Sequence, residues 1–375
     1  MKIAFFGSSL VSAYWNGAAT YYRGIIRNLA ALGHEITFFE PNAYERQQHR
    51  DLANDPEWAR VVVYAGEGLG GVSQALDSAR DFDVVVKASG VGVFDELLER
   101  AVVEQRTPNQ ITIFWDVDAP ATLKRIAHDM ADPFRALVPR YDLILTYGGG
   151  APVVRKYESF GAKQCIPVYN ALDPTTHHPV PRKKEFDADL SFLGNRLPDR
   201  EARVEEFFLR AAAFLPDRRF LLGGAGWDDK PLPRSVAYIG HVFTGDHNAF
   251  NCTPRAVLNV SRESMAANGW SPATRVFEAA GAGACLITDA WEGIDLFLEP
   301  DEEVLVASDG SEVADLVRTL DADRARRIGN AALKRVLAQH TYAHRARQVT
   351  DILEGGQSPS REHRHPGTLD HLVVG

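Results

Sequence analysis

Short apolar runs that alternate with amphipathic stretches constrain the fold of this chain more than any other feature. A first series of runs covers residues 2–7, 35–40, 83–89, 110–115, 143–147 and 164–169, and a second covers 189–194, 219–223, 256–261, 284–289 and 303–307. Several runs consist almost entirely of Val, Ile, Leu and Phe, as buried parallel strands do. Helical patterns such as 18–32 separate them, which predicts an α/β fold with parallel sheets.

The middle of the chain interrupts this alternation. Residues 172–187 (LDPTTHHPVPRKKEFD) hold three prolines, two histidines and a charge cluster, a composition typical of linkers. The length of 375 residues suggests about two domains. We therefore expect an α/β domain over 1–170, a linker over 171–187 and a second α/β domain over 188–340. A helix over 341–355, with the first domain as one packing partner, and a loose polar tail over 356–375 complete the predicted order.

Composition narrows the class of protein. The formal net charge of -9 argues against a nucleic-acid partner, because such binding needs a basic face. Cys165, Cys252 and Cys285 form no C-x-x-C pair, as expected for reduced thiols in the cytoplasm. No apolar stretch approaches the roughly 18 residues of a membrane span, and the N-terminal MKIAFFGSSL reads as a first strand rather than a signal peptide. We expect a cytoplasmic protein, while its oligomeric state stays open.

The segment 271–289 (SPATRVFEAAGAGACLITD) predicts an anion site. Ser271 and Pro272 resemble a helix start, with Ser as the N-cap and Pro at the first helical position. Free backbone N–H groups beside Thr274 and Arg275 would suit phosphate. Glu278 follows on the same face, about 6 Å further along the axis, where ribose hydroxyls would lie next to a diphosphate. The alternative is a surface helix with an ordinary Arg275–Glu278 pair.

This segment resembles the donor-binding signature of GT-B glycosyltransferases, especially the CgeB-like group. Residues 15–40 (WNGAATYYRGIIRNLAALGHEITFFE) are similar to the first loop, helix and strand of family 4 and CgeB-like enzymes. FWDVDAPATL, YGGGAPVVRKYESFGA, DLSFLGNRLPDRE, YIGHV and LNVSRESM follow in the expected order. The resemblance implies the GT-B architecture, in which two Rossmann-like domains face each other across a cleft. The nucleotide-sugar donor would bind the C-terminal domain and the acceptor the N-terminal one.

The resemblance also implies the role of individual residues. Glu278 would hold the ribose. The residues implied at the donor diphosphate are Arg196, Arg200, Arg262, Thr274 and Arg275. The loop implied at the base comprises Gly240, His241 and Val242. The positions implied in the cleft on the acceptor side are Asn16, Gly17, Thr20 and Gly149. Solvated surface arginines, a Thr20 that only begins a helix, and a glycine turn around Gly149 are the alternatives.

One position departs from the family pattern. Family 4 enzymes typically carry two glutamates separated by seven residues, and the first would fall at Trp270 here. That glutamate typically contacts the donor sugar. Its absence favours the CgeB-like branch and leaves the sugar and the stereochemical outcome open.

Asp116-Val117-Asp118 follows an apolar run and has three interpretations. A D-x-D motif binds a divalent metal in the other glycosyltransferase architecture, GT-A. Either Asp116 or Asp118 could instead bind acceptor hydroxyls or act as the general base of an inverting enzyme. The third option is a strand-end aspartate that satisfies a neighbouring turn. We expect no metal, because positive groups and a helix dipole can stabilise the leaving diphosphate.

Together these features predict a metal-independent glycosyltransferase that needs no cofactor. It would move a sugar from a nucleotide-diphosphate sugar to an acceptor nucleophile, a glycan or a small molecule. A nucleotide-sugar epimerase or hydrolase on the same fold, or a non-catalytic nucleotide-sugar-binding relative, remain the alternatives. The donor base, the sugar and the acceptor stay open, because a fold does not determine them.

Overall fold

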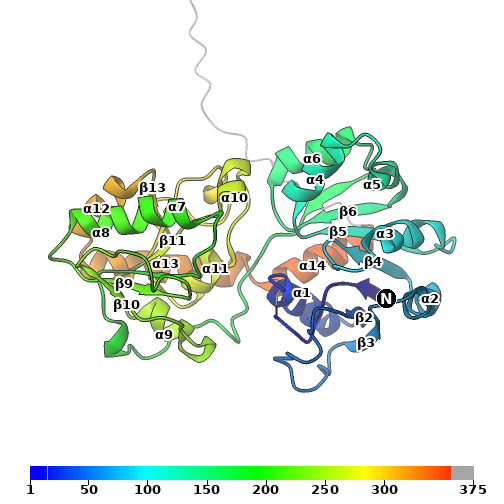
Figure 1. Cartoon of the computed structure of the whole chain (residues 1–375), viewed down its shortest axis with the longest axis horizontal. Helices are drawn as coiled ribbons and strands as arrows, with labels where there is room; N and C mark the ends of the chain where they lie inside the picture. The colour runs from blue at the N-terminus through cyan, green and yellow to red at the C-terminus, as the bar shows by residue number, and fades with distance from the viewer. Residues whose placement is uncertain (15, 356–375) are drawn as a thin grey trace, which may run out of the picture.

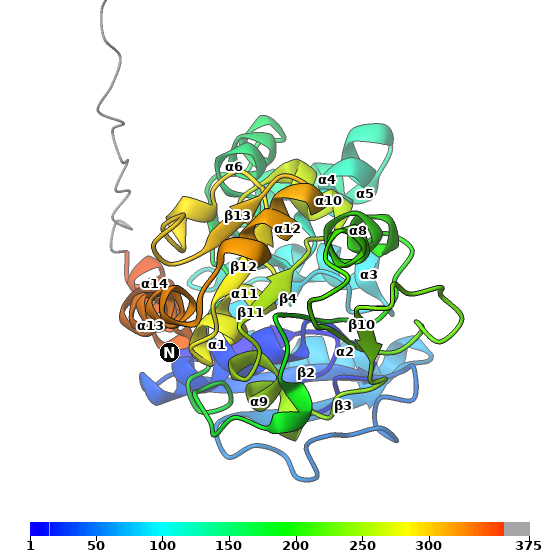
Figure 2. The ribbon, with the colours of Figure 1, turned by 90° about the vertical axis from the view of Figure 1, so that its left-hand side faces the viewer.

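The computed structural model describes residues 1–14 and 16–355. It shows two α/β domains side by side, with a last helix, α14 (Tyr342–Leu353), lying against the N-terminal one (Figure 1). Figure 2 views the molecule from the side of the C-terminal domain. Over these two ranges, no helix combines the length and apolar character that crossing a membrane requires.

The N-terminal sheet has seven parallel strands in the order β3-β2-β1-β4-β5-β6-β7. The strands are β1 (Lys2–Phe6), β2 (Glu35–Asn42), β3 (Arg60–Ala65), β4 (Val84–Ala88), β5 (Ile111–Asp116), β6 (Leu143–Thr146) and β7 (Cys165–Pro167). The chain runs outward in one direction from β1 and then in the other from β4. In such doubly wound sheets, ligands bind beyond the carboxyl ends of the strands at this switch point.

The two faces of this sheet follow from the period-two pattern of its strands. Ile3 and Phe5 of β1 point to the side covered by α1 and α14, whereas Ala4 and Phe6 point to the side covered by α2–α6. The helices are α1 (Ala19–Ala31), α2 (Leu69–Ser78), α3 (Asp95–Glu104), α4 (Ala119–His128), α5 (Pro133–Leu137) and α6 (Gly150–Ser159). Because α14 follows the second domain in the sequence, the core of the N-terminal domain includes residues from both ends of the described chain.

The C-terminal sheet has six parallel strands with the same winding, β10-β9-β8-β11-β12-β13. Its strands are β8 (Leu190–Leu193), β9 (Phe220–Gly223), β10 (Val236–Tyr238), β11 (Ala256–Asn259), β12 (Leu286–Asp289) and β13 (Leu305–Ala307). Its α-helices are α7 (Glu201–Val204), α8 (Arg210–Phe214), α9 (His247–Cys252), α10 (Glu263–Asn268), α11 (Thr274–Gly281), α12 (Gly310–Thr319) and α13 (Ala322–Gln339). A π-helical segment, η4 (Glu205–Leu209), joins α7 to α8. Short 3₁₀ turns are η1 (Ala79–Asp81), η2 (Val138–Arg140), η3 (Lys184–Phe186), η5 (Thr244–Asp246) and η6 (Ile294–Leu296).

The described structure confirms the predicted α/β class and adds two strands. The edge strands β3 and β10 were not predicted from the sequence. Most residues of β3 are partly or fully exposed, and β10 has three residues of which none is buried, so neither gives a continuous apolar run. The segment between the domains is held by backbone bonds, since Leu172 N donates to His340 O and Tyr342 N donates to Leu172 O.

Candidate active site

A cavity of about 480 Å³ lies between the domains, where the carboxyl ends of both sheets meet. The N-terminal domain lines it with residues that follow β1, β2, β4, β5 and β6: Ser8, Asn16, Gly17, Ala18, Tyr22, Arg46, Ser89, Gly90, Val117, Asp118, Ala119, Pro120, Tyr147 and Gly148. The C-terminal domain contributes Arg200, Val260, Arg262, Ser264, Met265, Ser271, Ala273 and Thr274. The geometry therefore brings predicted acceptor-side and donor-side residues into one space.

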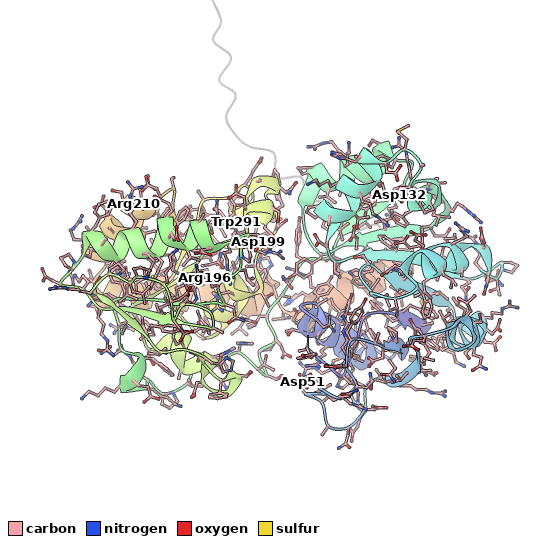
Figure 3. All side chains as sticks on the ribbon, viewed as in Figure 1. Asp51, Asp132, Arg196, Asp199, Arg210 and Trp291 are labelled. Carbon is pink, nitrogen blue, oxygen red and sulfur yellow. The ribbon has the colours of Figure 1, made fainter. Side chains whose placement is uncertain are left out.

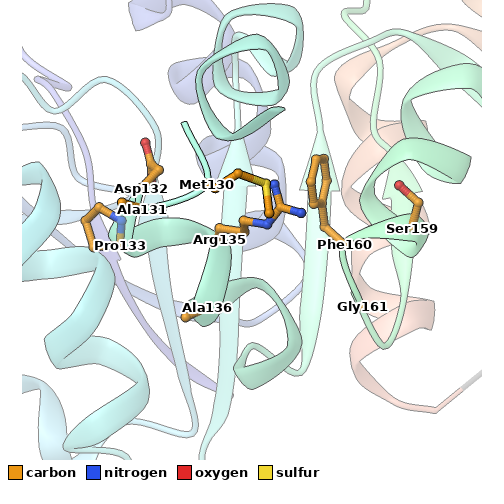
Figure 4. Close-up of a pocket in the computed structure, with 9 residues that line it drawn as sticks. All are labelled: Met130, Ala131, Asp132, Pro133, Arg135, Ala136, Ser159, Phe160 and Gly161. Carbon is orange, nitrogen blue, oxygen red and sulfur yellow. The ribbon is translucent and has the colours of Figure 1, made fainter. Parts of the chain in front are cut away.

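A larger cavity, of about 650 Å³, lies elsewhere in the N-terminal domain. Figure 4 shows it around Met130, Arg135 and Phe160, where the Arg135 guanidinium carbon stands 4.9 Å from the Phe160 ring centre. It adjoins the C-terminal end of α6, which is the opposite end from the carboxyl edge of the sheet. None of the predicted site residues lines it. We therefore place the active site in the interdomain cavity, despite its smaller volume.

The start of α11 differs from the sequence prediction. The helix begins at Thr274, and Ala273 occupies the N-cap position without a side-chain cap. Ser271 does not cap it, because its hydroxyl donates to Gly269 O at 2.9 Å and closes the turn before the helix. Pro272 lies in the preceding extended segment, and Asn170 Nδ2 donates to its carbonyl at 3.3 Å. Ala273 and Thr274, at the start of α11, still line the cavity.

Arg200 and Arg275 are two cationic side chains near the start of α11 that lie close enough to repel each other. Burial and repulsion by Arg275 hold the pKa of the Arg200 guanidinium below its usual value, and burial does the same to the pKa of Arg275. Within residues 1–14 and 16–355, neither arginine has a carboxylate within ion-pair distance. Arg200 donates from Nη2 to Asn195 O at 2.8 Å, while its Nε is buried without a hydrogen-bond partner. Two partly desolvated cations that repel each other are costly unless an anion joins them.

The other two predicted phosphate arginines have carboxylate partners. Arg262 lines the cavity and pairs with Asp199. Arg196 is bound by Glu201 and Asp229, each at 2.7 Å, and does not line the cavity. Figure 3 shows Arg196 and Asp199 on the C-terminal domain. The structure thus separates Arg196 from Arg200, Arg262 and Thr274, which line the cavity, because neighbouring carboxylates hold its side chain outside it. Arg275 does not line the cavity either.

The predicted ribose and base positions do not line the cavity: Glu278 lies on α11, and Gly240–Val242 follow β10. Glu278 Oε1 stands 3.9 Å from His177 Nε2, and its side chain is 20% exposed. In the predicted base loop, Gly240 has a φ of 70° and its carbonyl accepts from Gly224 N at 2.7 Å. His241 is exposed and meets Phe243 edge to face, whereas the Val242 side chain is buried in the core. Any contact of Val242 with a ligand would therefore involve its backbone.

The acceptor-side predictions divide in a similar way. Gly17 and Asn16 line the cavity. The Asn16 amide donates to Ser9 O and Ser12 O at 2.7 and 3.0 Å, so this side chain holds the loop after β1. Thr20 is exposed on α1 and is outside the lining. This result matches the alternative of a residue that merely begins the helix.

Gly149 and Trp270 form a contact between the domains. Gly149 N donates to Trp270 O at 2.8 Å. The Trp270 ring packs against Gly150 and Gly293, where an added Cβ would lie 2.6 and 2.2 Å from it. Its backbone adopts a φ of 42°, which is uncommon for a non-glycine residue. The residue at the expected glutamate position thus supports the domain interface. The glycines of the Gly148–Gly150 turn leave room for its ring and backbone.

The structure corrects one catalytic prediction. Asp116 is fully buried at the end of β5, and burial raises its pKa. Its oxygens accept from Tyr157 OH, from Thr122 Oγ1 at 3.1 Å and from Asp118 N at 3.0 Å. Asp116 therefore satisfies the strand-end turn and does not line the cavity. Asp118, in contrast, is exposed and lines the cavity.

Several lining residues were missed by sequence reasoning. Ser89, Gly90 and Tyr147 follow β4 and β6, so the strand-end rule could have identified them. Arg46 comes from a loop with no motif, and no sequence signal marks it. Among the residues with described positions, no group of three or more His, Cys, Asp or Glu side chains is arranged to hold a metal ion.

Comparison with protein-family models matches residues 200–351 to the glycosyl transferase-like family. The matched segment contains Arg200, Arg262, Arg275 and Glu278. A search of curated proteins finds no match.

Solved structures match almost the whole chain at low identity. Sucrose-phosphate synthase from Thermosynechococcus elongatus is 14% identical, with a TM-score of 0.69 and coverage of 95% of this chain and 98% of that chain. Anabaena HepE, solved with UDP-glucose, gives 14% identity, a TM-score of 0.65 and coverage of 95% and 100%. The β-glucosyltransferase of phage T4, also solved with UDP-glucose, is 10% identical, with a TM-score of 0.59 and coverage of 94% of this chain and 99% of that chain. The chain therefore has the GT-B fold, and with its glycosyl transferase-like domain it is a glycosyltransferase.

Proposed function

We propose that this chain transfers a glycosyl group from a UDP-sugar to an acceptor nucleophile in the interdomain cavity, without a metal ion. The choice of UDP rests on HepE and the T4 enzyme, whose structures contain UDP-glucose. The C-terminal domain, over about 188–340, would hold the donor, and the N-terminal domain, over about 1–170, the acceptor. The segment 171–187 would connect them.

The observation that carries this proposal is the pair of guanidinium groups of Arg200 and Arg275 near the start of α11: Arg200 lines the cavity, and among the described residues neither has a carboxylate within ion-pair distance. A diphosphate placed between them would neutralise both guanidinium groups and accept hydrogen bonds from the first backbone N–H groups of the helix. Thr274 lines the same space and Arg262 adds a third positive group. When the glycosidic bond breaks, the leaving diphosphate gains negative charge, and these groups would stabilise it. This positive charge takes the place of a divalent cation in the proposed mechanism.

The remaining roles are assigned in order along the donor, from the diphosphate to the ribose and then to the base. Glu278 lies one helical turn beyond Thr274, and its carboxylate would accept hydrogen bonds from the ribose hydroxyls. Backbone groups of Gly240–Val242 would contact the base. On the opposite wall, the exposed carboxylate of Asp118 would act as the base that takes the acceptor's proton. This role corresponds to an inverting outcome.

We also infer a CgeB-like subgroup and a cytoplasmic location. The first inference rests on the motif around Phe277 and Glu278 together with Trp270 in place of the first glutamate. The second rests on three free cysteines, of which Cys165 and Cys285 are buried.

A thermal-shift screen tests the donor assignment. The protein would be heated with UDP, GDP, dTDP, ADP and CDP, each with Mg²⁺ and with EDTA. A ligand at about 100 times its dissociation constant adds about 2.7 kcal/mol of stability, which is readily measured. We expect a shift with UDP that EDTA does not remove. A shift that requires Mg²⁺ would contradict metal independence, and no shift with any nucleotide would contradict the donor site.

Product analysis separates transfer from the alternatives. Incubation with donor alone would release free sugar from a hydrolase and an isomerised donor from an epimerase. A non-catalytic relative would bind the nucleotide without turnover. We expect transfer that depends on an added acceptor.

A further inference from the structure

The segment that connects the domains packs directly against the proposed donor site. Leu172 and the His177 carbonyl crowd Gly281 of α11, where an added Cβ would lie 2.3 Å from the Leu172 side chain and 3.2 Å from His177 O. On the other side, Asp173 Oδ2 stands 2.5 Å from Arg27 Nη2 of α1. The segment is therefore fixed to both domains and cannot be treated as a passive connection.

Hydrogen bonds orient one side chain of this segment toward α11. His177 Nδ1 lies 2.9 Å from Thr176 Oγ1, which directs the opposite ring nitrogen, Nε2, to Glu278 Oε1 at 3.9 Å. Thr176 O accepts from Asn248 Nδ2 of α9 at 2.9 Å, so the backbone that carries His177 is held as well. The two side chains are 12% and 20% exposed. The ring and the carboxylate thus meet in a partly desolvated site.

The position of Glu278 has a consequence for Arg275, its neighbour at i, i+3. Such a spacing favours an Arg–Glu pair along the helix. Among the described residues, however, the ion-pair contact of Glu278 is made with His177 and not with Arg275. Arg275 and Glu278 remain within electrostatic reach, since the Glu278 charge raises the pKa of Arg275 against the larger lowering effect of burial. Within the part of the chain that the structure describes, His177 and not Arg275 thus lies within ion-pair distance of the Glu278 carboxylate.

We propose that His177 is a positioning residue of the donor site, which holds the Glu278 carboxylate at the ribose end and leaves Arg275 available for the diphosphate. This inference rests on the proposed function. The other polar and charged groups around Glu278 are Tyr147, His247, Arg275 and Tyr342. None of them comes from the connecting segment, so His177 links this segment to Glu278 and, through it, to the donor.

The test measures recognition of the ribose by isothermal titration. The probes are UDP, GDP, ADP and CDP, each beside its 2′-deoxy counterpart, which lacks one ribose hydroxyl. Hydrogen bonds to charged groups contribute about 1.5–3 kcal/mol, so the parent should prefer the best ribonucleotide by roughly tenfold or more. We expect His177→Ala to lose most of this preference and His177→Gln, whose amide can still donate, to restore it.

Two further variants isolate the mechanism. Adding His177→Ala to Glu278→Ala should change the affinity by less than about twofold, because residues that act through one another are not additive. His178→Ala changes the next residue, which is exposed, and serves as the matched control. If the role of His177 were merely structural, His177→Ala would weaken the binding of ribonucleotides and deoxynucleotides equally. His177→Gln would then not restore the preference for the ribonucleotide.

The outcomes separate the two proposals. If the parent prefers a ribonucleotide and His177→Ala retains that preference, the positioning role is wrong while the donor site stands. If Glu278→Ala also retains it, the ribose assignment of Glu278 is wrong. If the parent binds none of the four pairs, the proposed function itself is overturned, and the role of His177 with it.

Discussion

Replacing Arg200 with methionine should stabilise the ligand-free protein and weaken donor binding. The substitution removes a desolvated charge that Arg275 and Arg262 repel and that Asp199 only partly offsets, while a side chain of similar length remains over the Phe192 ring. It loses one hydrogen bond, to Asn195 O. Replacing poorly compensated buried charges by apolar groups is often neutral or stabilising by about 1–4 kcal/mol. After subtracting about 1 kcal/mol for the lost bond, we expect the free energy of unfolding to rise by about 1 kcal/mol.

The affinity should change in the opposite direction. A hydrogen bond from a charged donor contributes about 1.5–3 kcal/mol, so the UDP affinity should fall roughly 10- to 150-fold. Urea denaturation of the ligand-free protein and titration with UDP measure the two effects separately. Arg196→Met is the control, because Glu201 and Asp229 already bind that side chain outside the cavity. It should leave UDP affinity within about twofold, as surface changes usually do. A clearly destabilised Arg200→Met, or one that binds UDP like the parent, would refute the reasoning.

Three other variants test separate parts of the structure. Asp118→Asn should reduce kcat by roughly 100-fold or more with unchanged UDP affinity, and an unchanged kcat in a transfer assay would remove Asp118 as the base. Glu99 is buried near Arg125, and burial raises its pKa to about 7. Its raised folded-state pKa means that the parent loses up to about 3 kcal/mol of stability between roughly pH 4.5 and 7. In urea denaturations, the free energy of unfolding of Glu99→Gln should differ less between pH 5 and pH 8 than that of the parent. An equal difference for both proteins would contradict the assignment. Gly150→Ala places a Cβ 2.6 Å from the Trp270 ring at a φ of 50°. It should cost about 2–4 kcal/mol, measured by thermal unfolding against Gly17→Ala, whose Cβ has nothing within 4 Å.

The sequence predicts the cores well because their signals are local. Alternation within β1 sends Ile3 and Phe5 to one face and Ala4 and Phe6 to the other, and both faces are covered by helices. The near-continuous apolar runs therefore identify the central strands of both sheets. The edge strands β3 and β10 lack this signal, since an edge strand needs only part of its surface to be apolar.

Residues of the site can be predicted from the sequence only where they directly follow a predicted strand. The rule that ligands lie at the carboxyl ends of parallel strands brings Asp118, Tyr147 and Thr274 to one cavity. The role of Ser271 could not be anticipated, because the same hydroxyl suits a helix cap and the turn it actually closes. His177 has no local signal either. Its segment has the composition of a linker, and its contact with Glu278 depends on tertiary packing across 101 positions of the chain.

Arg196 and Arg200 show why sequence pattern cannot assign charge chemistry. Both follow β8 within one short loop, and the same resemblance gave both the same role. The carboxylates of Glu201 and Asp229 neutralise Arg196, whereas Arg200 stacks over Phe192 and is repelled by Arg275 of α11, 75 positions away in the sequence. What distinguishes a surface ion pair from an anion site is the sign of the nearest charge after folding. That sign is set by tertiary contacts, so an unpaired cation is a stronger indication of a ligand than the motif that contains it.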